Sequence, residues 1–215
     1  MPNEESTALV QELRRANLEL TQAFDATIEG IARALDLREG EPAGHTNQVT
    51  QFTIELARSF GIHEDDLVHI RHGALLHDIG KLGIPENVLR KPGTLTAEDW
   101  VILHMHPQYA YDLLSPIDYL YPALDIPYCH HEKWDGSGYP RGLNGELIPF
   151  AARLFAVMDV WDALISPRPY REAWTQKDAR DYILAEAGRH FDPAVVRAFS
   201  NREFTKHLTA SIGKG

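Results

Sequence analysis

Hydrophobic residues recur along most of this chain at steps of three and four positions, which is the spacing of a helix with one apolar face. The longest such stretch covers residues 7–37, contains no proline and has a single glycine, Gly30. A second amphipathic stretch covers residues 49–60 and ends at Gly61, a residue type common at helix C-termini. The pattern therefore predicts two consecutive helices in the first part of the chain.

Further helices are predicted from their start signals. Asp65 or Asp66 is expected to begin a helix through residues 67–75, because a short acidic side chain can accept a hydrogen bond from the free backbone N–H groups. Thr96, followed three positions later by Asp99, resembles a capping box. The remaining predicted helices cover residues 122–131, 150–165, 175–188 and 193–199.

Alternation of apolar and polar positions, the mark of a half-buried strand, is nearly absent. Residues 143–146 offer at most a tight turn with a short β-ribbon inside a loop. We therefore predict an all-α fold, a helical bundle of about seven helices with one long functional loop. Residues 1–37 are predicted as an N-terminal helix, residues 38–205 as the domain that carries the chemistry, and residues 206–215 as a C-terminal tail.

The apolar positions of the first helix alternate at steps of three and four, as in a coiled-coil seam. Two interpretations stay open: the helix pairs two chains in parallel, or it is an ordinary amphipathic helix packed on its own domain. A long helix ahead of a domain is typical of a linker through which a sensor or receiver module drives an output domain. The chain is then either a fragment of a longer protein or a short example of its kind. The seam consists of Leu9, Leu13, Ala16, Leu20, Ala23 and Thr27.

Composition narrows the class of protein. With 215 residues and 44% hydrophobic content, the chain can bury one sizeable core. Its one cysteine, Cys129, excludes an intramolecular disulfide and is predicted to be a small buried thiol. The polar N-terminus lacks the pattern of a signal peptide, and no apolar run approaches the ~18 residues of a membrane span. We therefore expect a cytoplasmic protein.

Charge restricts the ligand. The formal net charge is −10, and the isoelectric point near 5.5 argues against binding a nucleic-acid polymer through a broad basic face. A small anionic ligand remains compatible, because bound divalent ions and a few basic side chains can make a local positive pocket. The charge therefore favours a small phosphate ligand over a polymer.

Histidines and carboxylates along the chain predict a metal centre. The strongest local signal is the pair His77 and Asp78, since neighbours on a helix point about 100° apart and can hold one ion from two sides. The carboxylate of Asp78 could also bridge two ions. The stretch HDIGKLGIP that contains the pair is far more specific than the pair itself. Imidazole with carboxylate and no thiolate suits Fe or Mn better than a structural zinc site.

A glycine-rich loop follows the paired histidines. Residues 135–140 read Asp-Gly-Ser-Gly-Tyr-Pro, and glycines there allow unusual backbone angles and close approach to a ligand. Trp134 and Tyr139 could stack on a base or pack the loop against the helices, and packing is the favoured interpretation. Downstream, Arg168 and Arg171 are candidates for clamping a phosphate.

Taken together, HDIGKLGIP, the stretch HHEKWDGSGYP and the AVMDVWDAL run resemble the HD-GYP family of cyclic-dinucleotide phosphodiesterases. The resemblance covers residues 25–200 or so. It implies hydrolysis of cyclic di-GMP to linear pGpG, to GMP or to both, by a metal-bridged hydroxide on two or three divalent ions, with Fe or Mn favoured. The implied metal ligands are Glu41, His45, His77, Asp78, His106, His130, His131 and Asp159.

The resemblance also implies substrate contacts and partners. Lys81 is expected to contact a substrate phosphate and to act in catalysis with His77 and Asp78. The GYP residues of the loop are expected to contact the substrate and diguanylate cyclase (GGDEF) domains. Pro167 departs from the family, which commonly has Asp there, and Lys133 stands where arginine is usual. The predicted substrate contacts are Lys81, Gly138, Tyr139, Pro140, Arg168 and Arg171.

Other interpretations stay open beside this one. The chain could be a catalytically weak module that binds a cyclic dinucleotide or a GGDEF domain, or an HD-domain enzyme with another reaction. Glu41 is either a ligand of a third ion or a solvated loop glutamate. Asp162 could be a ligand by spacing, but a helix-internal polar group bonded to a neighbour is favoured, and His104 is predicted to be a surface histidine. The other histidines are expected in surface or satisfied polar roles: His63, His69, His72, His190 and His207.

Overall fold

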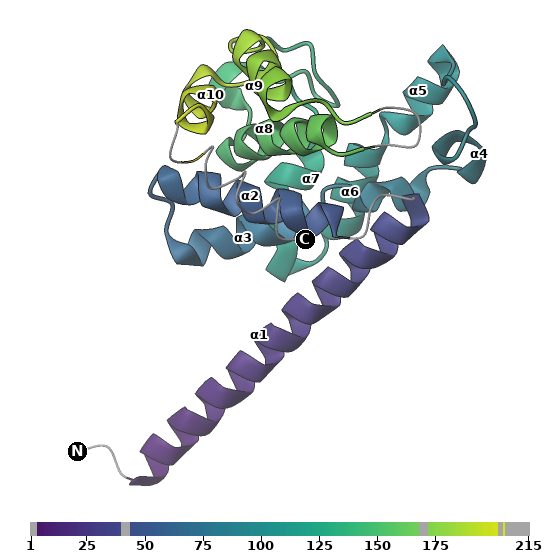
Figure 1. Cartoon of the computed structure of the whole chain (residues 1–215). Helices are drawn as coiled ribbons and strands as arrows, with labels where there is room; N and C mark the ends of the chain where they lie inside the picture. The colour runs from purple at the N-terminus through teal and green to yellow at the C-terminus, as the bar shows by residue number, and fades with distance from the viewer. Residues whose placement is uncertain (1–3, 40–43, 168–171, 202–203, 205–215) are drawn as a thin grey trace.

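The structure is a computed structural model that describes residues 4–39, 44–167, 172–201 and 204 (Figure 1). Over these residues the fold is helical, with isolated β-bridges and no strand, which confirms the all-α prediction. The described residues form ten α-helices rather than about seven, because short helical turns also occur between the longer helices. The α-helices are α1 (Glu4–Glu39), α2 (His45–Ser59), α3 (Glu64–Leu75), α4 (Glu86–Leu89), α5 (Ala97–Leu103), α6 (His106–Leu114), α7 (Asp125–Cys129), α8 (Phe150–Ile165), α9 (Gln176–Ala185) and α10 (Pro193–Phe199), with 3₁₀ helices η1 (Ile79–Gly83), η2 (Asp118–Ala123) and η3 (Gly145–Leu147).

Helix α8 lies at the centre of the main core. It is apolar around most of its circumference, as expected of a helix covered on several sides, and it packs against α2, α7, α9 and α10. Phe155 and Trp161 of α8 are fully buried and belong to the same core cluster as Phe52 of α2 and Phe199 of α10. Because this helix is packed on several sides, the polar side chains that it directs at the site are held in place.

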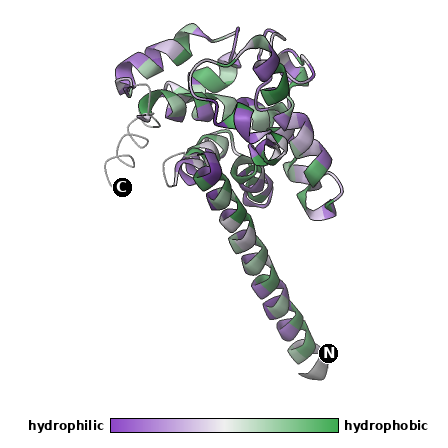
Figure 2. Cartoon of the chain, turned by 90° about the vertical axis from the view of Figure 1, so that its right-hand side faces the viewer, coloured by the Kyte–Doolittle hydropathy of each residue, from purple (hydrophilic) through white to green (hydrophobic). Residues whose placement is uncertain are grey.

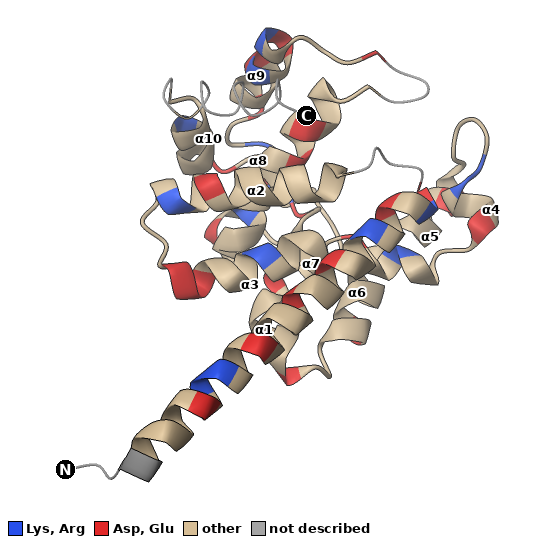
Figure 3. Cartoon of the chain, turned by 60° about the horizontal axis from the view of Figure 1, so that its bottom comes forward, with Lys and Arg blue, Asp and Glu red and all other residues tan. Residues whose placement is uncertain are grey.

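Helix α1 projects from this body as a long arm (Figure 1). Leu9, Leu13 and Leu20 of the predicted seam are 57%, 61% and 70% exposed. These side chains are therefore not packed against the rest of the described chain. Hydrophobic residues are spread along this projecting part (Figure 2), and basic and acidic residues are interleaved with them (Figure 3). The arm therefore carries an apolar stripe that its own domain does not cover.

The C-terminal part of α1 is anchored to the domain. Ala32 and Leu35 are buried in a second core cluster formed with α3, η1, α6 and η2. Beside this cluster, Nε2 of the fully buried His72 lies 2.7 Å from Oδ1 of Asp25, and Arg71 pairs with Glu29. His72 thus has the expected polar role only in part, because Nε2 has a partner whereas the buried Nδ1 has none among the described residues.

The helix starts agree in part with the sequence. Thr96 and Asp99 form the predicted capping box at the start of α5. The cap predicted for α3 was wrong, because its N-cap is His63, whose Nδ1 accepts a hydrogen bond from the backbone N–H of Asp65. Asp65 and Asp66 instead lie in the first turn, where a negative charge is favourable at the positive end of the helix dipole.

In the described ranges, no helix has the length and apolar character required to cross a membrane.

Candidate metal centre

The predicted ligands come from five separate segments that meet at one place. Most lie at helix ends: the first residues of α2 and α6, the segment between α3 and η1, and the end of α7, whereas Asp159 lies within α8. Glu41, the eighth predicted ligand, lies outside the described residues, as do Arg168 and Arg171. Seven of the predicted ligands lie in the described residues and converge: His45, His77, Asp78, His106, His130, His131 and Asp159.

One group of these residues surrounds the first oxygen of Asp78. Ligand atoms of Asp78, His106, His130 and His131 all lie within 4.8 Å of one another. His106 Nε2 is 3.3 Å from His130 Nε2 and 3.4 Å from Asp78 Oδ1. Four donors converging at this separation could hold one metal ion, with no thiolate among them. Burial raises the pKa of the neighbouring Cys129 to about 12, so this residue is the buried thiol that the sequence predicts.

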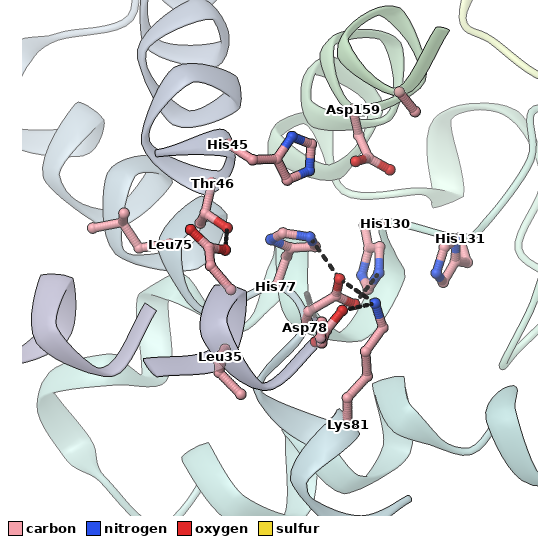
Figure 4. A pocket seen from close by; sticks show the side chains of 13 residues that line it. Leu35, His45, Thr46, Leu75, His77, Asp78, Lys81, His130, His131 and Asp159 are labelled. Atoms are coloured by element: carbon pink, nitrogen blue, oxygen red, sulfur yellow. Dashed lines mark hydrogen bonds and ion pairs between the residues drawn. The ribbon is translucent and has the colours of Figure 1, made fainter. Parts of the chain in front are cut away.

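The second oxygen of Asp78 faces another group. Asp78 Oδ2 lies 3.0 Å from His77 Nε2, and His45 and Asp159 line the same cavity of about 210 Å³ (Figure 4). Asp78 thus has one oxygen toward each group, the arrangement that a bridging carboxylate requires. Oδ1 is buried and accepts no hydrogen bond, which is costly unless a cation fills the place. The residues present therefore fit divalent ions.

Hydrogen bonds orient the imidazole rings toward the cavity. In His77, His106 and His130, Nδ1 lies 2.8, 2.8 and 3.0 Å from the carbonyl oxygen of a residue three or four positions earlier. A carbonyl oxygen only accepts, so Nδ1–H donates, and the lone pair of Nε2 is left for a ligand. Rings held in this way are typical of metal-binding histidines.

Burial also favours the neutral imidazole in most of the cluster. It lowers the pKa of His106, His130 and His131 below the ordinary value, so that a lone pair is available near neutral pH. For His77 burial acts in the same direction, but the charge and hydrogen bond of Asp78 outweigh it and raise the pKa to about 9. A bound cation would displace that proton. Burial also raises the pKa of Asp159.

A close backbone approach brings two of these segments together. A Cβ built on Gly80 would lie 1.8 Å from the carbonyl oxygen of His106, so any side chain there would force η1 away from the first turn of α6. Asp78 precedes η1, and His106 begins α6. The glycine after the His-Asp pair is therefore what lets Asp78 and His106 approach each other.

Lys81 reaches the same cavity but is already paired. Its Nζ lies 2.7 Å from Asp78 Oδ2 and 2.6 Å from Glu39 Oε2. Burial lowers the pKa of Lys81, but the two carboxylates outweigh it and hold the pKa above its ordinary value. Glu39 was not predicted as a site residue. Glu39 and Lys81 are 42 positions apart in the sequence, so no local spacing pattern connects them.

The glycine-rich loop packs against the cluster through Tyr139. The Tyr139 ring stacks on His131, with centroids 4.7 Å apart, and on His104, with centroids 3.9 Å apart. His104, predicted to be a surface histidine, is therefore half-buried, because the loop folds back over its ring. Trp134 also packs, with the Arg153 guanidinium 5.8 Å from its ring, so the structure confirms the packing interpretation for both aromatic residues.

The base of this loop is held by one buried carboxylate. Glu132 accepts hydrogen bonds from the backbone N–H groups of Arg141, at 2.8 Å, and Leu143, at 2.9 Å. At Gly138 the loop passes so close to the segment after His131 that an added Cβ would lie 2.3 Å from the Lys133 nitrogen. These contacts fix Tyr139 over the histidines.

Asp162 does not join the metal-facing groups. Its Oδ2 lies 2.6 Å from Nδ1 of His45, the ring atom that the other rings direct at a carbonyl. This agrees with the favoured interpretation of Asp162 as a helix-internal group bonded to a neighbour.

The comparisons with known proteins agree with this geometry. The model of the HD domain family matches residues 29–195. The chain is 40% identical over 193 residues to the cyclic di-GMP phosphodiesterase response regulator RpfG of Xanthomonas campestris, covering 89% of this chain and 51% of that protein. It is 37% identical over 194 residues to 3'3'-cGAMP-specific phosphodiesterase 2 of Vibrio cholerae, covering 89% and 36%.

A solved structure shows the same fold. The cyclic GMP-AMP-specific phosphodiesterase V-cGAP3 of V. cholerae superposes with a TM-score of 0.65 at 20% identity, over 87% of this chain and 51% of that chain. The chain spans about half, or less, of the length of the two curated relatives.

Proposed function

This chain belongs to the HD domain family, and on that premise we propose that it is a metal-dependent phosphodiesterase that hydrolyses a cyclic dinucleotide. The observation that carries the proposal is Asp78, whose Oδ2 lies 3.0 Å from His77 and whose Oδ1 lies near His106 and His130. The curated relatives are named as phosphodiesterases of cyclic di-GMP or 3'3'-cGAMP. Cyclic di-GMP is our favoured substrate, with pGpG, GMP or both as products.

We propose two or three divalent ions in this centre. Fe or Mn is favoured because the donor groups of the centre are imidazole and carboxylate. Asp78 would bridge two ions, and Glu41 would serve a third. When bound, such ions lower the pKa of water and polarise a phosphoryl oxygen, which supplies a nucleophile near neutral pH. The proposed ligands are Glu41, His45, His77, Asp78, His106, His130, His131 and Asp159.

The chain's own residues would bind and orient the phosphate. Lys81 keeps its positive charge near neutral pH and lies at the cavity, so it can stabilise negative charge on a phosphoryl oxygen. Arg168 and Arg171 would clamp the phosphate from the segment after α8. The loop residues Gly138, Tyr139 and Pro140 would contact the nucleotide and partly shield it from water.

Two partner proposals accompany this function. The exposed stripe on α1, with Leu9, Leu13 and Leu20, supports parallel pairing of two chains. The glycine-rich loop would contact a GGDEF domain. The buried thiol of Cys129 suits a reducing cytoplasm, where this second-messenger chemistry would take place.

The direct test is hydrolysis by the metal-loaded chain. Protein loaded anaerobically with Fe²⁺ or Mn²⁺ would be incubated with cyclic di-GMP, 3'3'-cGAMP or cyclic di-AMP, and the products separated by chromatography. We expect hydrolysis that disappears on chelation, and at least a 100-fold loss in Asp78→Ala because the bridging carboxylate is removed. Asp65→Ala, on the exposed start of α3, is the matched control. Equal rates in stripped and loaded protein would refute the proposal.

A further inference from the structure

We propose that Asp162 is a positioning residue that holds the ring of His45 in the orientation and tautomer needed to bind metal. The inference rests on the proposed metal centre. It concerns one residue of α8 that contacts a predicted ligand without facing the ions itself. The proposed role is that of a carboxylate that accepts the ring N–H of a metal-binding histidine, so that the other ring nitrogen can bind the metal.

The contact is short and buried, an ion-pair contact rather than an aligned hydrogen bond. Asp162 Oδ2 lies 2.6 Å from His45 Nδ1, and the side chains of Asp162 and His45 are 1% and 8% exposed. Asp159, three positions earlier on the same helix, lines the cavity with His45 (Figure 4). Helix α8 therefore supplies both a predicted ligand and the group that orients another ligand.

The remaining contacts of Asp162 hold the carboxylate in place. Gln48 of α2 donates from Nε2 to Asp162 Oδ1 at 2.6 Å. Ser166, at the end of α8, donates from Oγ to Oδ2 at 3.2 Å. Both carboxylate oxygens are thus engaged by protein groups, unlike Asp78, whose Oδ1 accepts no hydrogen bond. This difference separates a supporting carboxylate from one that could bind a cation.

The ring of His45 meets a different kind of acceptor from the other rings. His77, His106 and His130 direct Nδ1 at a carbonyl oxygen three or four residues earlier. His45 begins α2, and its Nδ1 lies against a carboxylate of α8. Asp162 provides the acceptor from a different helix, and a charged acceptor also makes the ring a stronger donor to metal.

The test compares metal affinity in Asp162→Asn and wild type. Gln48 would keep the amide oxygen engaged, so the amide N–H₂ would face His45 Nδ1 and favour the ring tautomer with the proton on Nε2. We expect Mn²⁺ affinity at one site to fall about 10- to 100-fold, with an unchanged helical circular dichroism spectrum. Asp181→Asn, the same change at an exposed position of α9, is the matched control and is expected to bind nearly as wild type does. Wild-type affinity in Asp162→Asn overturns the proposal.

A double-mutant cycle separates positioning from a general structural effect. In a His45→Ala background, Asp162→Asn should cause no further loss of metal affinity, because its target ring is gone. An equal loss in both backgrounds overturns the proposal.

A measurement on the unaltered protein covers the case in which Asp162→Asn fails to fold. With Zn²⁺ bound, ¹H–¹⁵N correlation of the histidine rings should place the His45 proton on Nδ1. A proton on Nε2 overturns the proposal. Metal binding without hydrolysis would refute the proposed function but leave the role of Asp162 supported, whereas a wild-type chain that binds no divalent ion would overturn both.

Discussion

Glu39 and Lys81 form a half-buried ion pair, with Oε2 and Nζ 2.6 Å apart, that joins the last residue of α1 to the cavity of the candidate metal centre. Oδ2 of Asp78 lies 2.7 Å from the same Nζ. In this state the charge of Lys81 is balanced by two carboxylates. A substrate phosphate would have to compete with these two carboxylates for Lys81. A cation bound to Asp78 would weaken the pairing of Asp78 with Lys81.

Loss of Lys81 should impair catalysis without removing metal. In Lys81→Ala, we expect the rate of cyclic di-GMP hydrolysis to fall about 100- to 1,000-fold, because a cation that stabilises the phosphoryl oxygens is lost. Metal content, measured by plasma mass spectrometry, should stay at the wild-type level. Arg168→Ala and Arg171→Ala should show smaller losses of the same kind. Wild-type behaviour in all three variants would mean that the phosphate site has been misplaced.

Glu41 should determine whether the centre holds a third ion. It lies four residues before His45, close enough in the chain for both to serve one ion. Wild type and Glu41→Ala would be reconstituted anaerobically with Fe²⁺, and the metal equivalents counted. We expect one ion fewer in the variant. Equal occupancy would make Glu41 a solvated loop residue.

The exposed stripe of α1 should hold two chains together. Deletion of residues 1–21 is expected to convert a dimer to a monomer in multi-angle light scattering, because it removes Leu9, Leu13 and Leu20. Replacing Leu13 and Leu20 by Glu should have the same effect, while Arg14→Glu, outside the seam, should leave the dimer intact. A full-length chain that is monomeric at high concentration contradicts this prediction.

Acidification should weaken the fold through His72. Burial lowers the pKa of His72 below 6.5, and Asp25 offsets this only in part. Between 6.5 and the lower folded-state pKa, the unfolded chain binds a proton that the folded chain excludes. The free energy of unfolding contributed by this group is therefore fully present above that window and falls as the pH drops through it.

Urea unfolding of metal-free protein from about pH 7.5 to about pH 5 measures this effect. His72→Gln keeps a donor for Asp25 but does not titrate, so its stability should depend less steeply on pH than that of wild type. Other buried histidines titrate in both proteins, and the difference between the two slopes isolates His72. Identical slopes would contradict the assignment.

The sequence predicts those parts of this molecule that depend on neighbours in the chain. The helical pattern, the capping box at Thr96 and the pair His77 and Asp78 are local features, readable at fixed spacings. The supporting contacts are not local: Glu39 meets Lys81 and His104 meets Tyr139 only after folding. No spacing rule connects such residues, so their roles follow from packing alone.

The end of α1 also forms hydrogen bonds with the main chain beside the site. Arg38 donates to the carbonyl oxygens of Lys81, at 2.8 Å, and Ile84, at 3.2 Å. Ala32 and Leu35, between the Asp25 contact and Glu39, are buried in the second core cluster, so this part of α1 moves only together with that core. The free part of the helix extends about 32 Å beyond Asp25, at a rise of about 1.5 Å per residue. A force on the free part would therefore reach Lys81 through the packing of α1 against η1, and in a centre where ångström-scale misplacement of a charge costs catalysis, such packing is a mechanical input.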